Sequence, residues 1–126
     1  MTNGIYATGW RDGNRVKVDK PLSLQSVHGP QFTIIEGGRY VGRCVYLTSD
    51  ASLSGFTLRD GYLNSGSGPV YGAGALGVAP ARCTLNNCTL IGNQPTGVVY
   101  GGGAAYSTLN NCTLTGNSVP LHQRRE

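Results

Sequence analysis

The chain has 126 residues, and 20 of them are glycine, against about 7% in an average protein. Only 13% of the residues are charged and the helix formers Glu, Lys and Gln are scarce, which excludes a helical bundle or a coiled coil. The net charge of +4 is spread thinly along the chain and does not indicate a nucleic-acid partner. No apolar stretch approaches the roughly 20 residues of a membrane-spanning helix, and the first residues lack the pattern of a signal peptide. We therefore expect neither a membrane span nor a signal peptide.

Four copies of one motif cover most of the chain, at positions 32–37, 53–61, 85–93 and 109–117. Phe56 of the second copy corresponds to Phe32 of the first, and Leu114 of the fourth corresponds to Leu90 of the third, which gives a period of about 24 residues. The spacing is longer between the second and third copies, where Leu58 corresponds to Leu90. The third and fourth copies are nearly identical. Repetition of this kind is typical of a solenoid.

Two loops explain the longer spacing between the second and third copies. Residues 71–74 resemble residues 100–103, which places three extra residues near 63–69 and five near 77–81. Both stretches are rich in Gly, Ser or Pro, as loops are. Neither of the two glycine-rich runs is followed by the Lys and Ser or Thr of a phosphate-binding loop, so we expect no nucleotide site.

Within each copy, apolar residues alternate with polar ones, which predicts short β-strands rather than helices. A unit of about 24 residues built this way cannot bury its own apolar face, so it must stack on its copies, as in a parallel β-helix. Two columns of side chains are then expected to point inward: Phe32, Phe56, Cys88 and Cys112 in one, and Ile34, Leu58, Leu90 and Leu114 in the other.

Several segments resemble the right-handed parallel β-helix repeat proteins of bacterial surface and secreted type. They are residues 3–9, 21–30, 33–37 and 53–58 and the two repeats at 84–90 and 108–114. The resemblance implies an all-β, right-handed single-stranded parallel β-helix of about four to five coils. Members usually have more coils, so this chain resembles a short, fragment-like member. The same solenoid carries polysaccharide lyases, hydrolases, adhesins and passive stalks, so the resemblance implies a fold rather than an activity.

We expect a single domain over residues 1–126. Residues 1–20 would supply a partial N-terminal coil, residues 21–118 the coils, and residues 119–126 a polar tail. The resembled family is mostly extracellular or on the cell surface, which the sequence of this chain does not itself indicate. No motif calls for a cofactor.

The four cysteines are Cys44, Cys83, Cys88 and Cys112. They do not have the spacing of zinc ligands, and no His lies within the last two copies, so no metal site is expected. Cys88 and Cys112 would stack one coil apart, at about 4.8 Å. A column of free interior thiols is the favoured interpretation, since such thiols behave as small apolar groups. A disulfide between these two residues is the alternative, at a separation near the lower limit for such bonds.

Asparagines recur one coil apart in the same way, as Asn87 with Asn111 and Asn93 with Asn117. Asparagine tolerates left-handed backbone conformations, and its amide both donates and accepts hydrogen bonds. We therefore predict that these stacked pairs satisfy their own polar groups at turns and have a structural role rather than a ligand-binding one.

One group of charged residues is a candidate catalytic site. Enzymes built on solenoids use clustered carboxylates together with Arg or Lys on an outer face. Glu36 and Asp60 occupy equivalent positions of adjacent copies, with Arg59 beside them, and stacked acids would raise one pKa by repulsion. The third and fourth copies have Gly at this position. Solvated acids neutralised by Arg39, Arg43 or Arg59 are the alternative interpretation.

A row of threonines, one from each copy, is expected to point outward: Thr33, Thr57, Thr89 and Thr113. Such a row resembles the surface of ice-binding solenoids. The adjoining outward row breaks the match, because only the last copy, with Thr113 and Thr115, pairs two threonines. Threonine is also common on exposed strands for reasons of packing alone.

Together these patterns favour a non-catalytic repeat module with a structural or adhesive role, with a polysaccharide as one candidate ligand. A carbohydrate-active enzyme of the lyase or hydrolase type, using Glu36, Asp60 and Arg59, is the competing function, and an ice-binding solenoid is a further alternative. A short solenoid exposes strand edges at both ends, and the polar tail is a poor lid. We therefore expect a homo-oligomer, most simply a dimer whose C-terminal coils abut on a two-fold axis.

Overall fold

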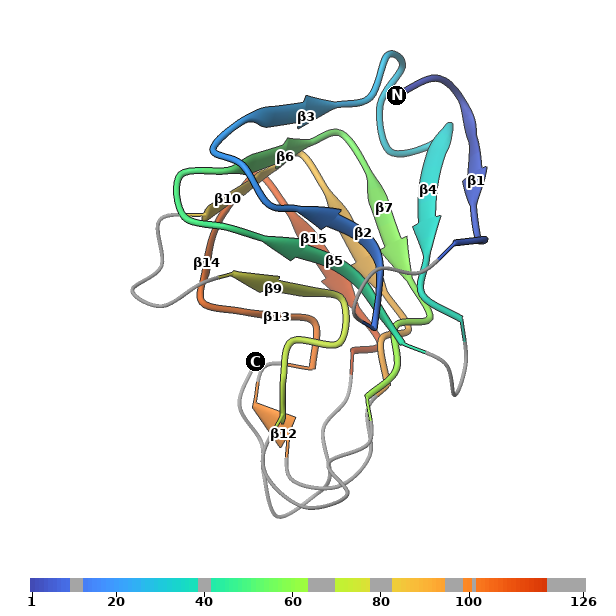
Figure 1. The fold of residues 1–126 in the computed structure, drawn as a ribbon. Helices are drawn as coiled ribbons and strands as arrows, with labels where there is room; N and C mark the ends of the chain where they lie inside the picture. The colour runs from blue at the N-terminus through green and yellow to red at the C-terminus, as the bar shows by residue number, and fades with distance from the viewer. Residues whose placement is uncertain are drawn as a thin grey trace.

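The computed structural model describes residues 1–9, 13–38, 42–63, 70–77, 83–94, 99–100 and 102–117. Within these residues the chain forms 15 β-strands and no helix, so none of them belongs to a helix that could cross a membrane (Figure 1). The prediction of an all-β fold is confirmed. Arg39, most of the two expected loops and the tail at 119–126 lie outside the described residues.

The strands form three parallel sheets and a short parallel pair. Sheet A contains β1 (Gly4–Tyr6), β4 (Thr33–Glu36), β7 (Thr57–Arg59), β11 (Thr89–Ile91) and β15 (Thr113–Thr115). Sheet B contains β2 (Asn14–Val18), β5 (Arg43–Leu47), β9 (Ala75–Gly77) and β13 (Ala104–Ala105). Sheet C contains β3 (Ser23–Gln25), β6 (Ser52–Ser54), β10 (Cys83–Asn86) and β14 (Ser107–Asn110). The pair consists of β8 (Val70–Tyr71) and β12 (Val99–Tyr100).

After β1 the chain visits the sheets in a fixed order, B, then C, then A, and completes this round four times. In the last two rounds β8 and β12 add a short strand before sheet B. Strands therefore pair with their equivalents in neighbouring rounds, so the sheets run side by side around one interior (Figure 1). Parallel sheets visited in this order are consistent with a β-helix or solenoid.

The core lies between the three sheets. Each sheet contributes inward side chains that are fully buried in the middle rounds, including Leu53 and Leu85 from sheet C, Leu58 and Leu90 from sheet A, and Val45 and Leu47 from sheet B. Phe56, at the corner before β7, is also fully buried. Burial of aliphatic side chains is the main force that holds the rounds together, because a single round has no core of its own.

The pairing register confirms the alignment of the later copies. Leu90 pairs with Leu58 on one side and with Leu114 on the other, as the alignment of the second, third and fourth copies requires. Tyr71 pairs with Tyr100, which confirms the alignment of the two glycine-rich runs. Leu114 lies in the predicted inward column but is 40% exposed, because β15 is the last strand of sheet A among the described residues.

The first copy is shifted by one residue from its predicted register. Ile35, rather than Ile34, pairs with Leu58. Thr33 and Ile35 are fully buried, whereas Phe32 is 53% exposed. The prediction that Phe32 and Ile34 point inward is therefore wrong, because a shift of one residue moves every side chain to the opposite face.

The corner between sheets C and A explains this shift. In the later rounds two residues make the corner, and the first of them, Gly55, Asn87 or Asn111, has a left-handed backbone with φ of 79°, 52° or 53°. In the first round seven residues, 26–32, connect β3 to β4. Because a short turn fixes the register of the strand that follows it, the longer connection frees β4 from the spacing of the later copies.

We expect substitutions on opposite faces of β10 to have different effects on stability. Leu85→Ala removes a fully buried side chain and should lower the free energy of unfolding by about 2–5 kcal/mol. Thr84→Ala, on the outer face of the same strand, should cost about 1 kcal/mol or less. Urea denaturation of both variants measures the difference, and equal losses would contradict the register of sheet C.

Candidate functional site

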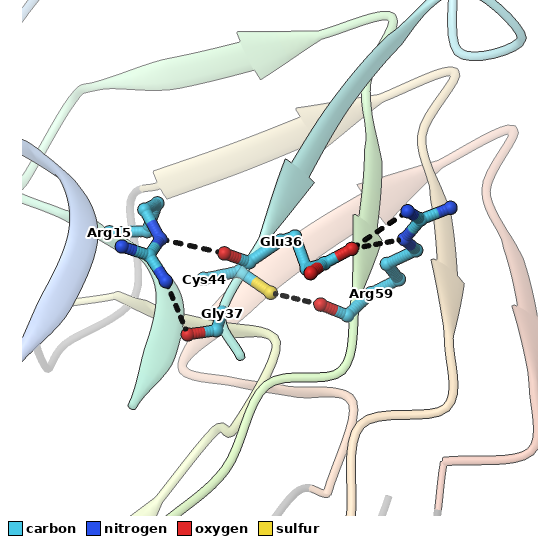
Figure 2. A network of polar contacts seen from close by, with 5 residues as sticks. All are labelled: Arg15, Glu36, Gly37, Cys44 and Arg59. Atoms are coloured by element: carbon cyan, nitrogen blue, oxygen red, sulfur yellow. Dashed lines mark hydrogen bonds and ion pairs between the residues drawn. The ribbon is translucent and has the colours of Figure 1, made fainter. Parts of the chain in front are cut away.

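The candidate catalytic residues Glu36 and Arg59 form an ion pair. Glu36 ends β4 and pairs in register with Arg59, which ends β7. Nε and Nη2 of Arg59 donate to Oε2 of Glu36 at 2.8 and 2.7 Å (Figure 2). The side chains of Arg59 and Glu36 are 34% and 27% exposed, respectively. Water therefore screens the ion pair, and its contribution to stability is about 1 kcal/mol at most.

Asp60 does not stack on Glu36, so the expectation of adjacent carboxylates at equivalent positions is wrong. Asp60 follows β7 in a left-handed conformation with φ of 56°. Its Oδ1 leans toward the following round, 3.2 Å from where a Cβ on Gly92 would lie. The one-residue shift of β4 is the cause, because it places Glu36 opposite the cation of Arg59 instead of opposite Asp60.

Arg15 in β2 binds the main chain at the end of β4, next to this ion pair. Its Nε donates to the carbonyl oxygen of Glu36 at 2.7 Å, and its Nη2 donates to that of Gly37 at 3.0 Å (Figure 2). Its Nη1 donates to the carbonyl oxygen of Gly9 at 3.0 Å. Arg15 therefore fixes the end of β4 through the main chain.

Arg43 in β5 has the same role at the next corner. It donates to the carbonyl oxygens of Tyr71 and Gly72 at 2.9 and 2.7 Å and to Oδ1 of Asn14 at 2.8 Å. Burial lowers the pKa of Arg43 to about 10, which leaves it charged at neutral pH. The expectation that Arg43 neutralises Glu36 or Asp60 has no contact to support it, whereas Arg59 pairs with Glu36.

The thiol of Cys44 lies between Arg15 and Arg59 in Figure 2 and donates to the carbonyl oxygen of Arg59 at 3.2 Å. The same carbonyl accepts the backbone N–H of Gly37 at 3.0 Å. Burial is the main cause that raises the pKa of Cys44 to about 12. Because only the thiolate is an effective nucleophile, Cys44 acts as a buried hydrogen-bond donor rather than a reactive group.

Asn93 and Asn117 form a buried ladder one round apart, as predicted. Nδ2 of Asn93 donates to Oδ1 of Asn117 at 2.7 Å and to the carbonyl oxygen of Leu58 at 3.1 Å. Oδ1 of Asn93 accepts the backbone N–H of Gly61 at 2.8 Å. Nδ2 of Asn117 donates to the carbonyl oxygen of Leu90 at 2.8 Å. Each amide thus binds the main chain of the round before it.

The outward threonine row differs from its prediction at the first position. Thr33 is fully buried, and Ile34 takes its place opposite Thr57. Thr57, Thr89 and Thr113 do pair in register. The hydroxyl of Thr57 donates to the carbonyl oxygen of Pro30 at 2.6 Å, so it is already engaged within the protein.

The cysteines are all free in the structure, and Cys44, Cys83 and Cys88 are buried. The thiol of Cys88 donates to the carbonyl oxygen of Leu53 at 3.6 Å, and burial is the main cause that raises its pKa to about 11. Cys112 donates to the equivalent carbonyl, that of Leu85, at 3.3 Å. The same contact therefore repeats from one round to the next.

The outer face of sheet C carries a regular polar surface that the sequence analysis missed. Its outward side chains are uncharged hydroxyls and amides, and they are Ser23, Gln25, Ser52, Ser54, Thr84, Asn86, Thr108 and Asn110. Oγ of Ser23 lies 2.7 Å from Oγ of Ser52, and Nδ2 of Asn110 donates to Oδ1 of Asn86 at 3.0 Å. The alternation of these residues with leucine is the signal that would have found this face.

No protein family, curated protein or solved structure matches this chain. In the part of the chain that the structure describes, no three His, Cys, Asp or Glu side chains are grouped in a way that could hold a metal ion.

The buried amide of Asn93 should contribute far more to stability than an exposed one. Asn93→Ala leaves the N–H of Gly61 and the carbonyl oxygen of Leu58 without their side-chain partner, so we expect a loss of about 2–4 kcal/mol in the free energy of unfolding. Asn110→Ala is the matched control, because Asn110 also bonds to an asparagine one round away but is exposed. A chemical denaturation series in which both variants lose the same amount would contradict the internal ladder.

Proposed function

We propose that this chain is a non-catalytic module built as a right-handed single-stranded parallel β-helix of about four to five coils, with a structural or adhesive role. The fixed order in which the chain visits the three sheets supports the solenoid. Right-handedness is supported by the strong preference for right-handed connections between parallel strands of one sheet.

The contact between Glu36 and Arg59 is the observation that carries the non-catalytic part of the proposal. A glycosidase needs two carboxyl groups that flank the substrate, and a lyase needs a base that is not already neutralised. Here the carboxylate of Glu36 is engaged by Arg59, and Asp60 leans away into the next round. These residues are therefore better suited to fix the register of β4 than to transfer a proton.

The polar face of sheet C supports an adhesive role. Its hydroxyls and amides lie at the regular spacing of the strands, with no charged or apolar side chain among the outward residues of β3, β6, β10 and β14. A surface of this chemistry suits an uncharged hydroxyl-rich polymer, and a neutral polysaccharide is the ligand class we propose.

A glycan array combined with reducing-sugar and lyase assays tests this function. We expect no cleavage of any glycan by the chain, and the same result for Glu36→Gln and Asp60→Asn. Asp19→Asn is the control, because Asp19 is an exposed acid outside sheet A. Cleavage that Glu36→Gln or Asp60→Asn abolishes, and Asp19→Asn leaves intact, would establish an enzyme instead.

We further propose that the chain forms a homo-oligomer, most simply a dimer in which the C-terminal ends abut. At the N-terminal end Met1 packs against the core, and its carbonyl oxygen accepts the backbone N–H of Val27. At the other end Leu114 is 40% exposed, although its equivalent Leu90 is fully buried. The exposure of Leu114, whose equivalents are buried, is the reason to place the contact at the C-terminal end, although the first round also exposes the apolar side chains of Ile5, Leu22, Val27 and Phe32.

Sedimentation over micromolar to millimolar concentration tests the assembly. We expect the mass of a dimer for the unmodified chain and a shift toward the monomer for Leu114→Glu. Ile5→Glu is the control, because Ile5 is an exposed apolar residue on the strand at the opposite edge of sheet A. The mass of a single chain throughout the concentration range would rule out the dimer.

A further inference from the structure

We infer that the exposed edge of the last described round, formed by β13, β14 and β15, is a binding surface for a parallel polypeptide segment that carries the motif of residues 109–117. The partner is thus defined by its chemistry, as an extended chain with Asn, Cys and Leu at the spacing found in the third and fourth copies. This inference does not depend on the dimer proposed above.

The open surface consists of inward side chains that no further described round covers. In β11 the central Leu90 is fully buried, whereas all three residues of β15 are exposed. Leu109 and Cys112 are half-buried, although their equivalents Leu85 and Cys88 are buried. An apolar surface bordered by three parallel strand edges can accept another strand in each sheet.

Side-chain hydrogen bonds then specify which residues the partner must carry. Oδ1 of Asn93 accepts the backbone N–H of Gly61, and Oδ1 of Asn117 accepts that of Asn93. Nδ2 of Asn93 donates to the carbonyl oxygen of Leu58, and Nδ2 of Asn117 donates to that of Leu90. The next asparagine in this series would accept the N–H of Asn117 and donate to the carbonyl oxygen of Leu114.

The cysteine column repeats in the same direction. The thiol of Cys88 reaches the carbonyl oxygen of Leu53 in the preceding round and that of Asn86 in its own. The thiol of Cys112 likewise reaches the carbonyl oxygens of Leu85 and Asn110. The next cysteine in the series would donate to the carbonyl oxygen of Leu109. The contact thus points toward the preceding round, so the last described round presents the acceptor that a following round would use.

The amides on the outer face of sheet C follow the same rule. Nδ2 of Asn86 lies 3.4 Å from Oγ of Ser54, and Nδ2 of Asn110 donates to Oδ1 of Asn86. The exposed Oδ1 of Asn110 is the acceptor for a third amide. The two amide columns therefore call for Asn at the positions of Asn110 and Asn117, and the thiol column adds Cys at the position of Cys112 as a weaker contribution.

A peptide with the sequence of residues 104–117, in which the position of Cys112 carries alanine, tests this inference. We expect it to bind the whole chain, as measured by fluorescence anisotropy of a dye on the peptide. Binding should also slow the labelling of Cys112 by a thiol reagent, located by mass spectrometry, toward the slower rate of the buried Cys88. A second peptide with Asn117→Ala should bind on the order of tenfold more weakly, because two polar groups of the chain lose their partner.

A third peptide with Thr115→Ala is the matched control, since residue 115 points outward, and it should bind as the first peptide does. Absence of binding, or equal affinity for the Asn117→Ala and Thr115→Ala peptides, would overturn the inference. A chain that sediments as a monomer yet binds the peptide would refute the dimer alone. A chain that dimerises and releases its partner when the peptide is added would support both.

Discussion

Parallel register is the constraint on which the rest of the structure depends. Every round must lie on the one before it with equivalent residues in contact, because the strands bond between rounds and not within them. Two-residue corners with a left-handed first residue impose this register in the later rounds. Once the register is fixed, equivalent leucines stack on one another from round to round, and so do equivalent asparagines.

The register also explains how the chain tolerates polar groups in its interior. The buried amide of Asn93 is acceptable because Leu58, Gly61 and Asn117 meet its hydrogen-bonding groups at fixed positions. Thr33 shows the contrary case, since its hydroxyl is buried without a hydrogen-bond partner among the described side chains. Thr33 lies in the first round, where a longer connection replaces the tight corner. The unsatisfied hydroxyl therefore occurs in the least regular of the rounds.

Much of the fold could be predicted from the sequence because repetition carries long-range information. Residues that align between copies pair between neighbouring strands, so the alignment of Leu58, Leu90 and Leu114 predicts which strands pair. The register of β4 could not be found this way, because seven residues connect β3 to β4 where the later rounds have two, so the spacing of the later copies does not apply. The error then spread to the candidate site, because one residue of shift decides whether Glu36 faces Asp60 or Arg59. The contacts of Arg15 and Arg43 with carbonyl oxygens could not be predicted from the sequence, because every residue carries a carbonyl oxygen that an arginine side chain can bind.

The direction of the side-chain ladders makes the first and last described rounds chemically different. Asn117 and Cys112 bind toward the preceding round, so the last round presents acceptors shaped for another copy of the motif. The first strand of sheet A cannot supply that copy. Gly4 pairs with Thr33, and the equivalent position is cysteine in the third and fourth rounds. If a second copy stacked head to tail on the last described round, its first strand would therefore lack the thiol donor of the cysteine column. Continuation into an open filament of identical chains is disfavoured for this reason, which agrees with the symmetric contact and the motif-bearing partner that we propose.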